Sequence, residues 1–223
     1  MKKTVLISIV LSIFSSCKII HSLTELNKTN AKIYSYKTGN KEIRFIPMHH
    51  LGKKEFYDNV KKLVTDHKNK GYVVYYELIS TDFTKDSLLK DSIRRKVRKL
   101  KGFSGSYKDN ANGSYFKKYI QQPTYTSLGT DSTDLRADVN YLQLINQWEK
   151  ANGTIMLDSA DLKTSFNEKF NKSTFYTKKQ YKKIFIQYRN DYLIHLIKTS
   201  HDKKILIIYG AGHRKDLKKR INK

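Results

Sequence analysis

Three residues with metal-binding side chains, His50, Glu77 and His213, each follow closely on an apolar stretch of the chain. Two imidazoles and one carboxylate can bind a divalent metal ion and leave coordination positions open for water and substrate. A metal ion held in this way lowers the pKa of its bound water and polarises a carbonyl group, as hydrolysis requires. The three residues are far apart in the sequence, so their spacing alone also fits ordinary surface or core side chains.

The clearest strand signal lies directly before His213. Residues 205–209 are all apolar or aromatic and three of them are β-branched, which predicts a buried strand. Gly210-Ala211-Gly212 then allows the backbone to turn and another group to approach closely. Ligands of α/β proteins bind outside the carboxyl ends of strands, so this rim is a candidate site. A glycine-rich turn with no function is the alternative.

Two further strands are expected to end near His50 and Glu77. Residues 31–36 and 42–48 predict a hairpin with its turn at residues 37–40. Residues 72–76 have almost no polar side chain, which predicts a strand in the interior of a sheet.

An amphipathic helix is predicted over residues 53–69, between these strands. A strand, helix and strand at this spacing form a βαβ unit, so the two strands are expected to be parallel. Parallel strands end at the same edge of a sheet, which brings His50 and Glu77 together. If residues 205–209 run in the same direction, His213 joins them.

The middle of the chain, residues 80–177, is expected to be mainly helical and to pack over this edge as a lid or substrate wall. Plain core packing is the alternative for any single residue there. A long helix should follow, with Arg189 beside its apolar side, where the arginine either extends to solvent or meets a carboxylate. The expected helices are residues 86–101, 115–122, 139–151, 159–170 and 178–200.

The chain begins with the features of an export signal. Lys2-Lys3 precede a short apolar segment, Thr4–Phe14, which is too short to span a bilayer. Ser15-Ser16-Cys17 resembles a bacterial lipoprotein cleavage site, which implies a signal peptide over residues 1–16 and a lipid on Cys17. Residues 17–30 then form a tether. Cys17 is the only cysteine, so a disulfide and a cysteine-based metal site are excluded.

The net charge is +24, and removal of residues 1–16 takes away two lysines and no acids, leaving +22. The localisation implied by the signal is the cell envelope, on the periplasmic or cell-surface side of a membrane. There the charge predicts attraction to anionic lipid or a cell-wall polymer. Nucleic acid ranks last as a partner, because no helix-turn-helix, zinc-finger or RNA-recognition pattern is present.

Five segments, in order, resemble the TraB/GumN/Tiki superfamily, in its small bacterial lipoprotein branch. They cover most of the mature chain apart from its middle: Phe45–Gly52, Phe56-Tyr57, Gly71–Glu77, Arg189-Asn190 and Ile208–His213. The resemblance implies a fold related to the erythromycin-esterase and ChaN-like proteins. It also implies metal-dependent proteolysis of a peptide or protein substrate, with manganese or cobalt as the favoured ion and zinc as another candidate.

The family carries two Gly-x-x-His motifs. The second is intact as Gly210–His213, with Gly210 and Gly212 shaping the backbone. His50 matches the histidine of the first motif, but Pro47 stands where the family has glycine.

A glutamate and an arginine also match. Glu77 corresponds to the family glutamate, as a metal ligand or as a general base. Arg189 corresponds to an arginine before the last strand and is expected to pair with Glu77 or to steady an oxyanion. Asp138 lies in an Ala-Asp element of the lipoprotein branch to which no role is assigned.

The expected architecture is a single α/β domain over residues 31–223, with residues 80–177 as a helical insertion over the strand ends. Its central sheet should be mixed and largely parallel, flanked by helices, with an N-terminal hairpin. Two functions compete. One is a metal-dependent hydrolase using His50, Glu77 and His213 as ligands. The other is an inactive lipoprotein that binds a metal, haem or a cell-envelope polymer.

Overall fold

The computed structural model describes residues 25–104, 114–170, 172 and 175–221. The predicted signal peptide and the lipidation site, Cys17, lie outside these residues. None of the helices in the described part of the chain is long and apolar enough to cross a bilayer.

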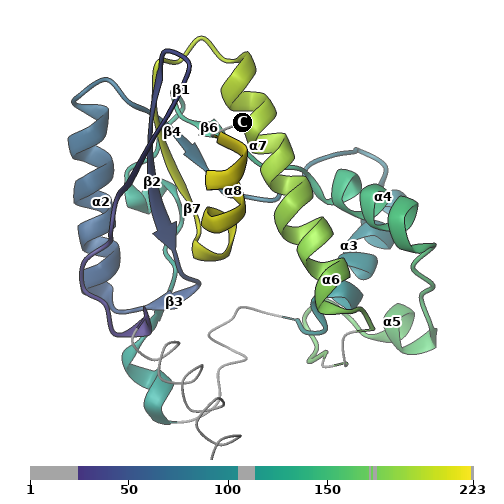
Figure 1. Ribbon diagram of the computed structural model, residues 1–223. Helices are drawn as coiled ribbons and strands as arrows, with labels where there is room; N and C mark the ends of the chain where they lie inside the picture. Colours follow the sequence, from purple (N-terminus) through teal and green to yellow (C-terminus); the bar gives the residue numbers. More distant parts are fainter. Residues whose placement is uncertain (1–24, 105–113, 171, 173–174, 222–223) are drawn as a thin grey trace, which may run out of the picture.

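The protein is an α/β structure built on a five-stranded mixed sheet (Figure 1). The strand order is β1-β2-β7-β4-β6, and only β1 runs antiparallel to its neighbour. The strands are β1 (Tyr34–Thr38), β2 (Lys41–Met48), β4 (Val73–Tyr76), β6 (Leu135–Arg136) and β7 (Lys204–Gly210).

The predicted hairpin and the parallel βαβ arrangement are both confirmed. β1 and β2 pair across the turn at Gly39, whose φ of 56° lies in the left-handed region that glycine adopts without strain. β2 and β4 are parallel, but they are not neighbours, because β7 lies between them and pairs with both.

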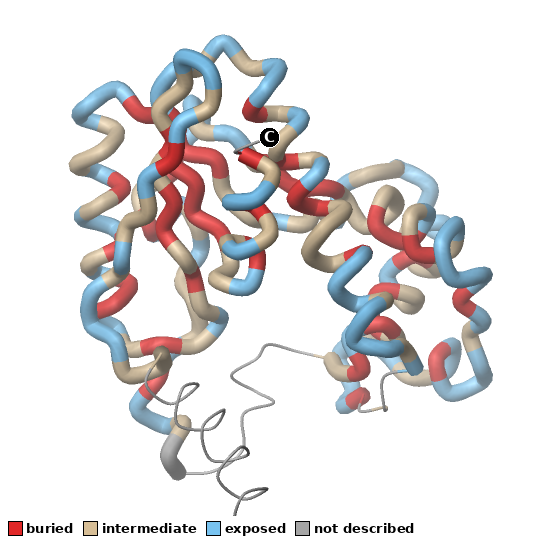
Figure 2. The backbone as a smooth tube through the Cα atoms, in the orientation of Figure 1, coloured by how far each residue is buried: buried red, intermediate tan, exposed pale blue. Residues whose placement is uncertain are grey.

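Strand β7 is at the centre of the sheet, and Ile205 to Tyr209 are completely buried. Successive side chains of a strand point to opposite faces. Leu206 and Ile208 therefore pack in one core cluster with residues of α2 (Lys54–Lys68), whereas Ile205, Ile207 and Tyr209 pack in another with residues of α7 (Arg189–Thr199) and α8 (Arg214–Ile221). Helices cover both faces, which explains the continuous apolar run (Figure 2).

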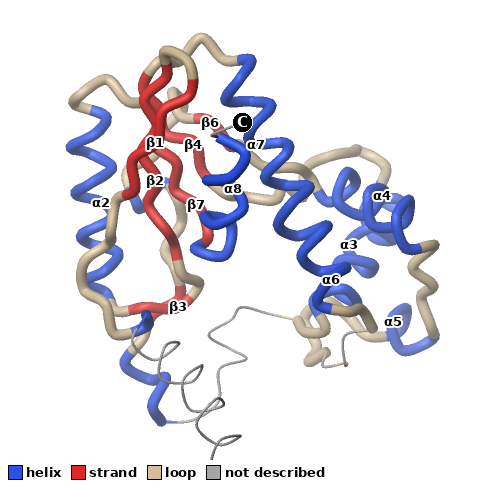
Figure 3. Tube along the Cα trace, viewed as in Figure 1, coloured by secondary structure: helices blue, strands red, loops and turns tan. Residues whose placement is uncertain are grey.

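A third core cluster lies outside the sheet, in a group of helices that we call the helical unit. The helical unit consists of α3 (Ser87–Lys101), α4 (Tyr141–Asn152), α5 (Ser159–Lys163), α6 (Lys178–Tyr181) and the π-helix η3 (Lys182–Tyr188). Val97, Leu144, Trp148 and Ile184 are among its buried residues. The segments α6, η3 and α7 follow one another without a break and run from the helical unit to the sheet (Figure 3).

Two helix predictions are wrong in part. Within the predicted helix 115–122, the 3-10 helix η1 (Ser114–Lys118) is followed by the strand β5 (Ile120–Gln121), because β5 pairs with β3 (Leu51–Gly52). The predicted helix 159–170 stops at Lys163. The backbone turns there, and the carbonyl groups of Thr164 and Ser165 accept hydrogen bonds from the buried Arg98.

Candidate functional site

A pocket of about 850 Å³ lies between the carboxyl ends of the parallel strands and the helical unit. Residues that follow β2, β4 and β7 form its polar end, including His50, Glu77 and His213. Side chains of α3, α4, α6 and η3 form its other walls, most of them apolar or aromatic. Residues of the helical unit therefore face the strand ends across this pocket.

Three of the predicted site residues, Glu77, Arg189 and His213, meet at the polar end of the pocket. Arg189 Nη2 donates to Glu77 Oε1 over 2.6 Å, and Arg189 Nη1 lies 3.3 Å from His213 Nε2. The distance from His213 Nε2 to Glu77 Oε1 is 3.5 Å. The side chains of Arg189, Glu77 and His213 are only 6%, 13% and 5% exposed. The guanidinium therefore lies against both of the other groups, shielded from water.

Asp138, for which the sequence predicts no role, is the second partner of Arg189. Its carboxylate accepts hydrogen bonds from Arg189 Nε over 2.9 Å and Nη2 over 2.6 Å, a bidentate pair. The backbone N–H of Val139 donates to the same carboxylate over 2.9 Å, and the Asp138 side chain is completely buried. An acidic residue between two apolar ones, Ala137 and Val139, is the only local sign that this aspartate lies inside.

The orientation of His213 is fixed by Asn190. Asn190 Nδ2 donates to the carbonyl oxygen of His213 and to Asp216 Oδ2. Its Oδ1 therefore accepts the hydrogen bond from His213 Nδ1, over 2.8 Å. This places the proton on Nδ1 and leaves Nε2 as an acceptor, which faces Glu77 and accepts a hydrogen bond from Arg189 Nη1. Asn190 lies in one of the segments that resemble the family, but the resemblance assigns it no role, and Asp216 has no sequence signal. Each acts only through the partner it meets in the fold.

Burial raises the pKa of Glu77, but the charges of Arg189 and His213 and the N–H of Gly210 outweigh burial and lower the pKa to about 2. Burial lowers the pKa of His213 to about 4. At neutral pH the site thus contains an ionised carboxylate and an uncharged imidazole.

Burial also raises the pKa of Asp138, and the Arg189 guanidinium opposes this rise. Because all three hydrogen bonds to Asp138 stabilise its ionised form, we treat it as charged at neutral pH. Glu77, Asp138 and Arg189 then carry one negative charge together.

His50 lines the same pocket but is an exposed residue. Burial of part of its ring lowers the pKa of His50, while the charge of Glu77 opposes this effect. His49 lies against Glu25, with 3.4 Å between Nε2 and Oε2. Among the described residues, no three His, Cys, Asp or Glu side chains form a group that could hold a metal ion. The structure thus brings Glu77 and His213 into contact and leaves His50 at the pocket wall.

Gly210 is the point at which backbone and carboxylate come closest. Its N–H donates to Glu77 Oε2 over 2.5 Å, and a Cβ atom at this position would lie 2.9 Å from that oxygen. At Gly212 a Cβ atom would meet only Ile186 Cδ1, at 3.7 Å. Neither glycine has a positive φ. Gly210 is therefore required for the close approach of Glu77 rather than for the turn.

Pro47, which replaces the glycine of the first motif, lies inside β2 opposite Tyr209. The strand continues through Pro47 to Met48, so the proline does not displace the end of β2 from its parallel neighbour β7.

Comparison with known proteins adds no relative. No protein-family model, no curated protein and no solved structure matches the chain.

Replacement of Gly210 by alanine should disturb the site, because the new methyl group would displace the Glu77 carboxylate from its hydrogen bonds. We expect Gly210→Ala to lower the free energy of unfolding by about 1–3 kcal/mol, measured by urea denaturation. The control is Gly212→Ala, which should change it by less than about 0.5 kcal/mol. Equal effects of the two substitutions would contradict the close approach of Glu77.

The pKa of His213 predicts a pH-dependent stability. Between pH 6.5 and 4 the unfolded chain binds a proton that the native site excludes, so the free energy of unfolding should fall as the pH falls through this window. His213→Gln should weaken this dependence between pH 7 and 5, where Glu77 does not yet titrate. The matched control is His195→Gln, at an exposed position outside the pocket lining. Identical slopes for wild type and His213→Gln would refute the assignment.

Proposed function

We propose that this pocket is the active site of a hydrolase that cleaves a peptide or a related acyl bond. The observation that carries the proposal is His213 Nε2, which is unprotonated, oriented through Asn190, and 3.5 Å from the ionised Glu77. Both groups lie at the polar end of a pocket large enough for a substrate.

In this proposal His213 and Glu77 orient a water molecule, and one of them accepts a proton from it as the water oxygen attacks the substrate carbonyl. That proton then passes to the leaving amine or alcohol as the acyl bond breaks. An uncharged imidazole and an ionised carboxylate are the protonation states that such a base requires. Arg189 acts through its ion pairs. All three of its nitrogens already donate to Glu77, Asp138 or the carbonyl oxygen of Phe185, so it positions Glu77 and offsets its charge.

A divalent metal ion is part of the proposal, with manganese, cobalt and zinc as the candidates and His50, Glu77 and His213 as the residues that would hold it. The donor types are suitable, because they are imidazole nitrogens and a carboxylate in metal-binding protonation states. In the described residues the three side chains are not gathered into one metal-binding group, so His50 and Arg189 would have to move for all three to reach an ion. The negative charge left on Glu77, Asp138 and Arg189 together also favours a bound cation. When bound, the ion would supply Lewis-acid activation of water.

A binding function without hydrolysis is the second candidate. It is favoured by the Arg189 guanidinium, which already donates to Glu77 and lies 3.3 Å from His213, and by the position of His50 at the pocket wall. The ligand would then be a metal, haem or a cell-envelope polymer. In both cases we propose that the protein is a TraB/GumN/Tiki-like lipoprotein tethered through Cys17 in the cell envelope, near anionic lipid or polymer.

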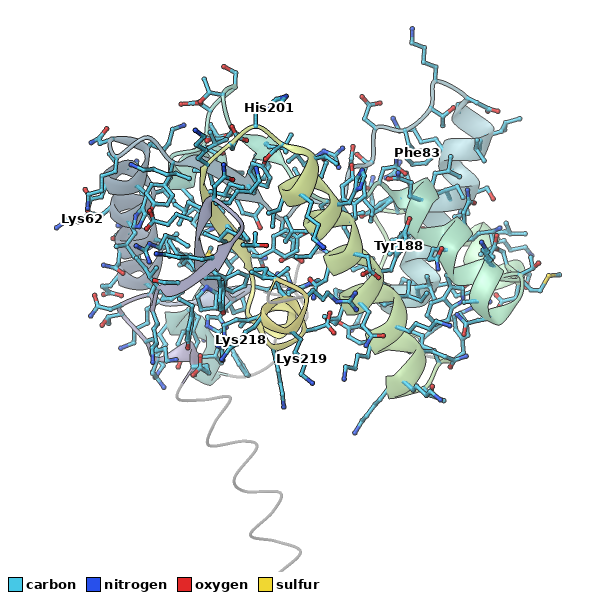
Figure 4. All side chains as sticks on the ribbon, turned by 45° about the horizontal axis from the view of Figure 1, so that its top comes forward. Lys62, Phe83, Tyr188, His201, Lys218 and Lys219 are labelled. Carbon is cyan, nitrogen blue, oxygen red and sulfur yellow. The ribbon has the colours of Figure 1, made fainter. Side chains whose placement is uncertain are left out.

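The test is to purify the full chain and measure its metal content and its hydrolysis of a peptide library with and without added manganese. Glu77→Ala and His213→Ala should each remove metal binding and reduce hydrolysis at least about 100-fold. His201→Ala is the matched control, since His201 is exposed in the loop before β7, at the opposite end of that strand (Figure 4).

A folded wild type that neither binds metal nor cleaves any peptide would contradict the hydrolase proposal and leave the binding function. If hydrolysis survives complete removal of metal, the proposed roles of His213 and Glu77 stand and the proposed metal ion is rejected.

A further inference from the structure

The pocket wall opposite the strand ends presents a stack of aromatic rings. Tyr181 and Phe185 lie with ring centroids 4.9 Å apart and planes inclined by 22°, and Tyr176 stacks on Tyr181 at 6.0 Å and 23°. All three side chains line the pocket. We call these three residues the aromatic wall. The planes are nearly parallel within these two pairs, whereas Tyr176 and Phe185 are inclined by 38°. The stacked pairs present flat ring surface rather than the edges that aromatic pairs present in a T-shaped contact.

Part of this surface is left uncovered by the residues that the structure describes. Tyr181 is 43% exposed, although large aromatic side chains usually bury most of their area. Behind the wall lies a buried tryptophan. Trp148 is only 2% exposed and contacts Tyr176 and Phe185 with ring centroids 5.3 and 6.2 Å away. A supported aromatic surface that faces a pocket is a typical binding surface for an apolar ligand group.

The aromatic wall adjoins the polar end of the pocket. Phe185 and Arg189 are four residues apart, and Arg189 Nη1 donates to the carbonyl oxygen of Phe185 over 3.3 Å. Tyr181 is close enough to respond to the charges of Arg189 and Glu77, although burial is the main reason that its pKa is raised. A group stacked on the wall would therefore share one pocket with a bond held at Glu77 and His213.

Charge restricts the ligand further. Aromatic faces can also bind cations, but Lys101 and Arg189 line the same pocket in a protein with a net charge of +24. Lys101 would repel a cationic group, and the net negative charge of Glu77, Asp138 and Arg189 would repel an anionic one, so the ligand group is neutral.

From these contacts we propose that the aromatic wall recognises a neutral aromatic ring of the substrate, adjacent to the bond that is cleaved. The substrate class of the proposed hydrolase would then be compounds with an aromatic ring next to the cleaved bond. The cleavage part of this proposal rests on the proposed hydrolase function. The recognition step can be tested by itself, because it involves residues outside the Glu77, Arg189 and His213 cluster.

Trp148 is the only tryptophan of the chain and packs against the aromatic wall, so its fluorescence should report binding. The full chain is titrated with N-acetyl-phenylalanine amide, N-acetyl-leucine amide and N-acetyl-glycine amide. We expect a saturable change with the phenylalanine compound and at least tenfold weaker binding of the other two. Equal binding of the leucine compound would mean an apolar site without aromatic preference and would overturn the proposal.

Tyr181→Ala should weaken binding of the phenylalanine compound at least tenfold, and Tyr181→Phe should retain it. Tyr181 is 43% exposed, so the alanine variant should remain folded, as circular dichroism would verify. The control is Tyr34→Ala, a partly exposed tyrosine on the edge strand β1, which should bind as wild type does. Unchanged affinity in Tyr181→Ala would overturn the proposal.

Binding and hydrolysis have separate outcomes. Aromatic binding that persists in His213→Ala, together with a higher kcat/KM for aromatic than for glycine substrates in the wild type, is the expected result. Hydrolysis without any preference for aromatic substrates would refute substrate recognition by the aromatic wall, while the hydrolase proposal would stand. Binding of the aromatic compound without any hydrolysis would refute the hydrolase proposal, while the aromatic wall would stand as a binding site.

Discussion

The buried guanidinium of Arg189 is the interaction on which the polar end of the pocket depends. Moving a charged group out of water costs several kcal/mol, and the cost is recovered only when its hydrogen bonds and charge are well matched. Asp138 supplies a bidentate carboxylate and Glu77 a second one. Because Arg189 lies between them, two carboxylates can be ionised at one edge of the sheet. Glu77 can then face the pocket in its charged form.

The fold brings these groups together through parallel strands. β2, β4, β6 and β7 all end at one edge, and the residues that follow them supply His50, Glu77, Asp138 and His213. Arg189 arrives from a different direction, at the junction of the π-helix η3 and α7. The wider turns of a π-helix change which residues face one side, and such segments often occur at functional sites. Here Phe185, Ile186 and Arg189 all line the pocket.

Much of the sheet could be predicted from the sequence, because a continuous apolar run such as residues 205–209 indicates a strand whose side chains are buried on both faces of the sheet. β6 is too short, at two residues, to produce a pattern, and β5 forms only because Leu51 and Gly52 lie beside it in the fold. At the site, His213 and Glu77 could be predicted from their positions after strands. The roles of Asp138 and Asn190 could not, since each depends on a partner at least 23 residues away in the sequence.

The most direct test of the Arg189 interaction is a double-mutant cycle for the free energy of unfolding, with Arg189→Met, Asp138→Asn and the double variant. Each single substitution should cost about 3–5 kcal/mol, because it leaves a buried charge without its partner. The double variant should be less destabilised than the sum of the two by at least about 1 kcal/mol. Additivity within about 0.5 kcal/mol would show that the two residues are not coupled and would contradict the account.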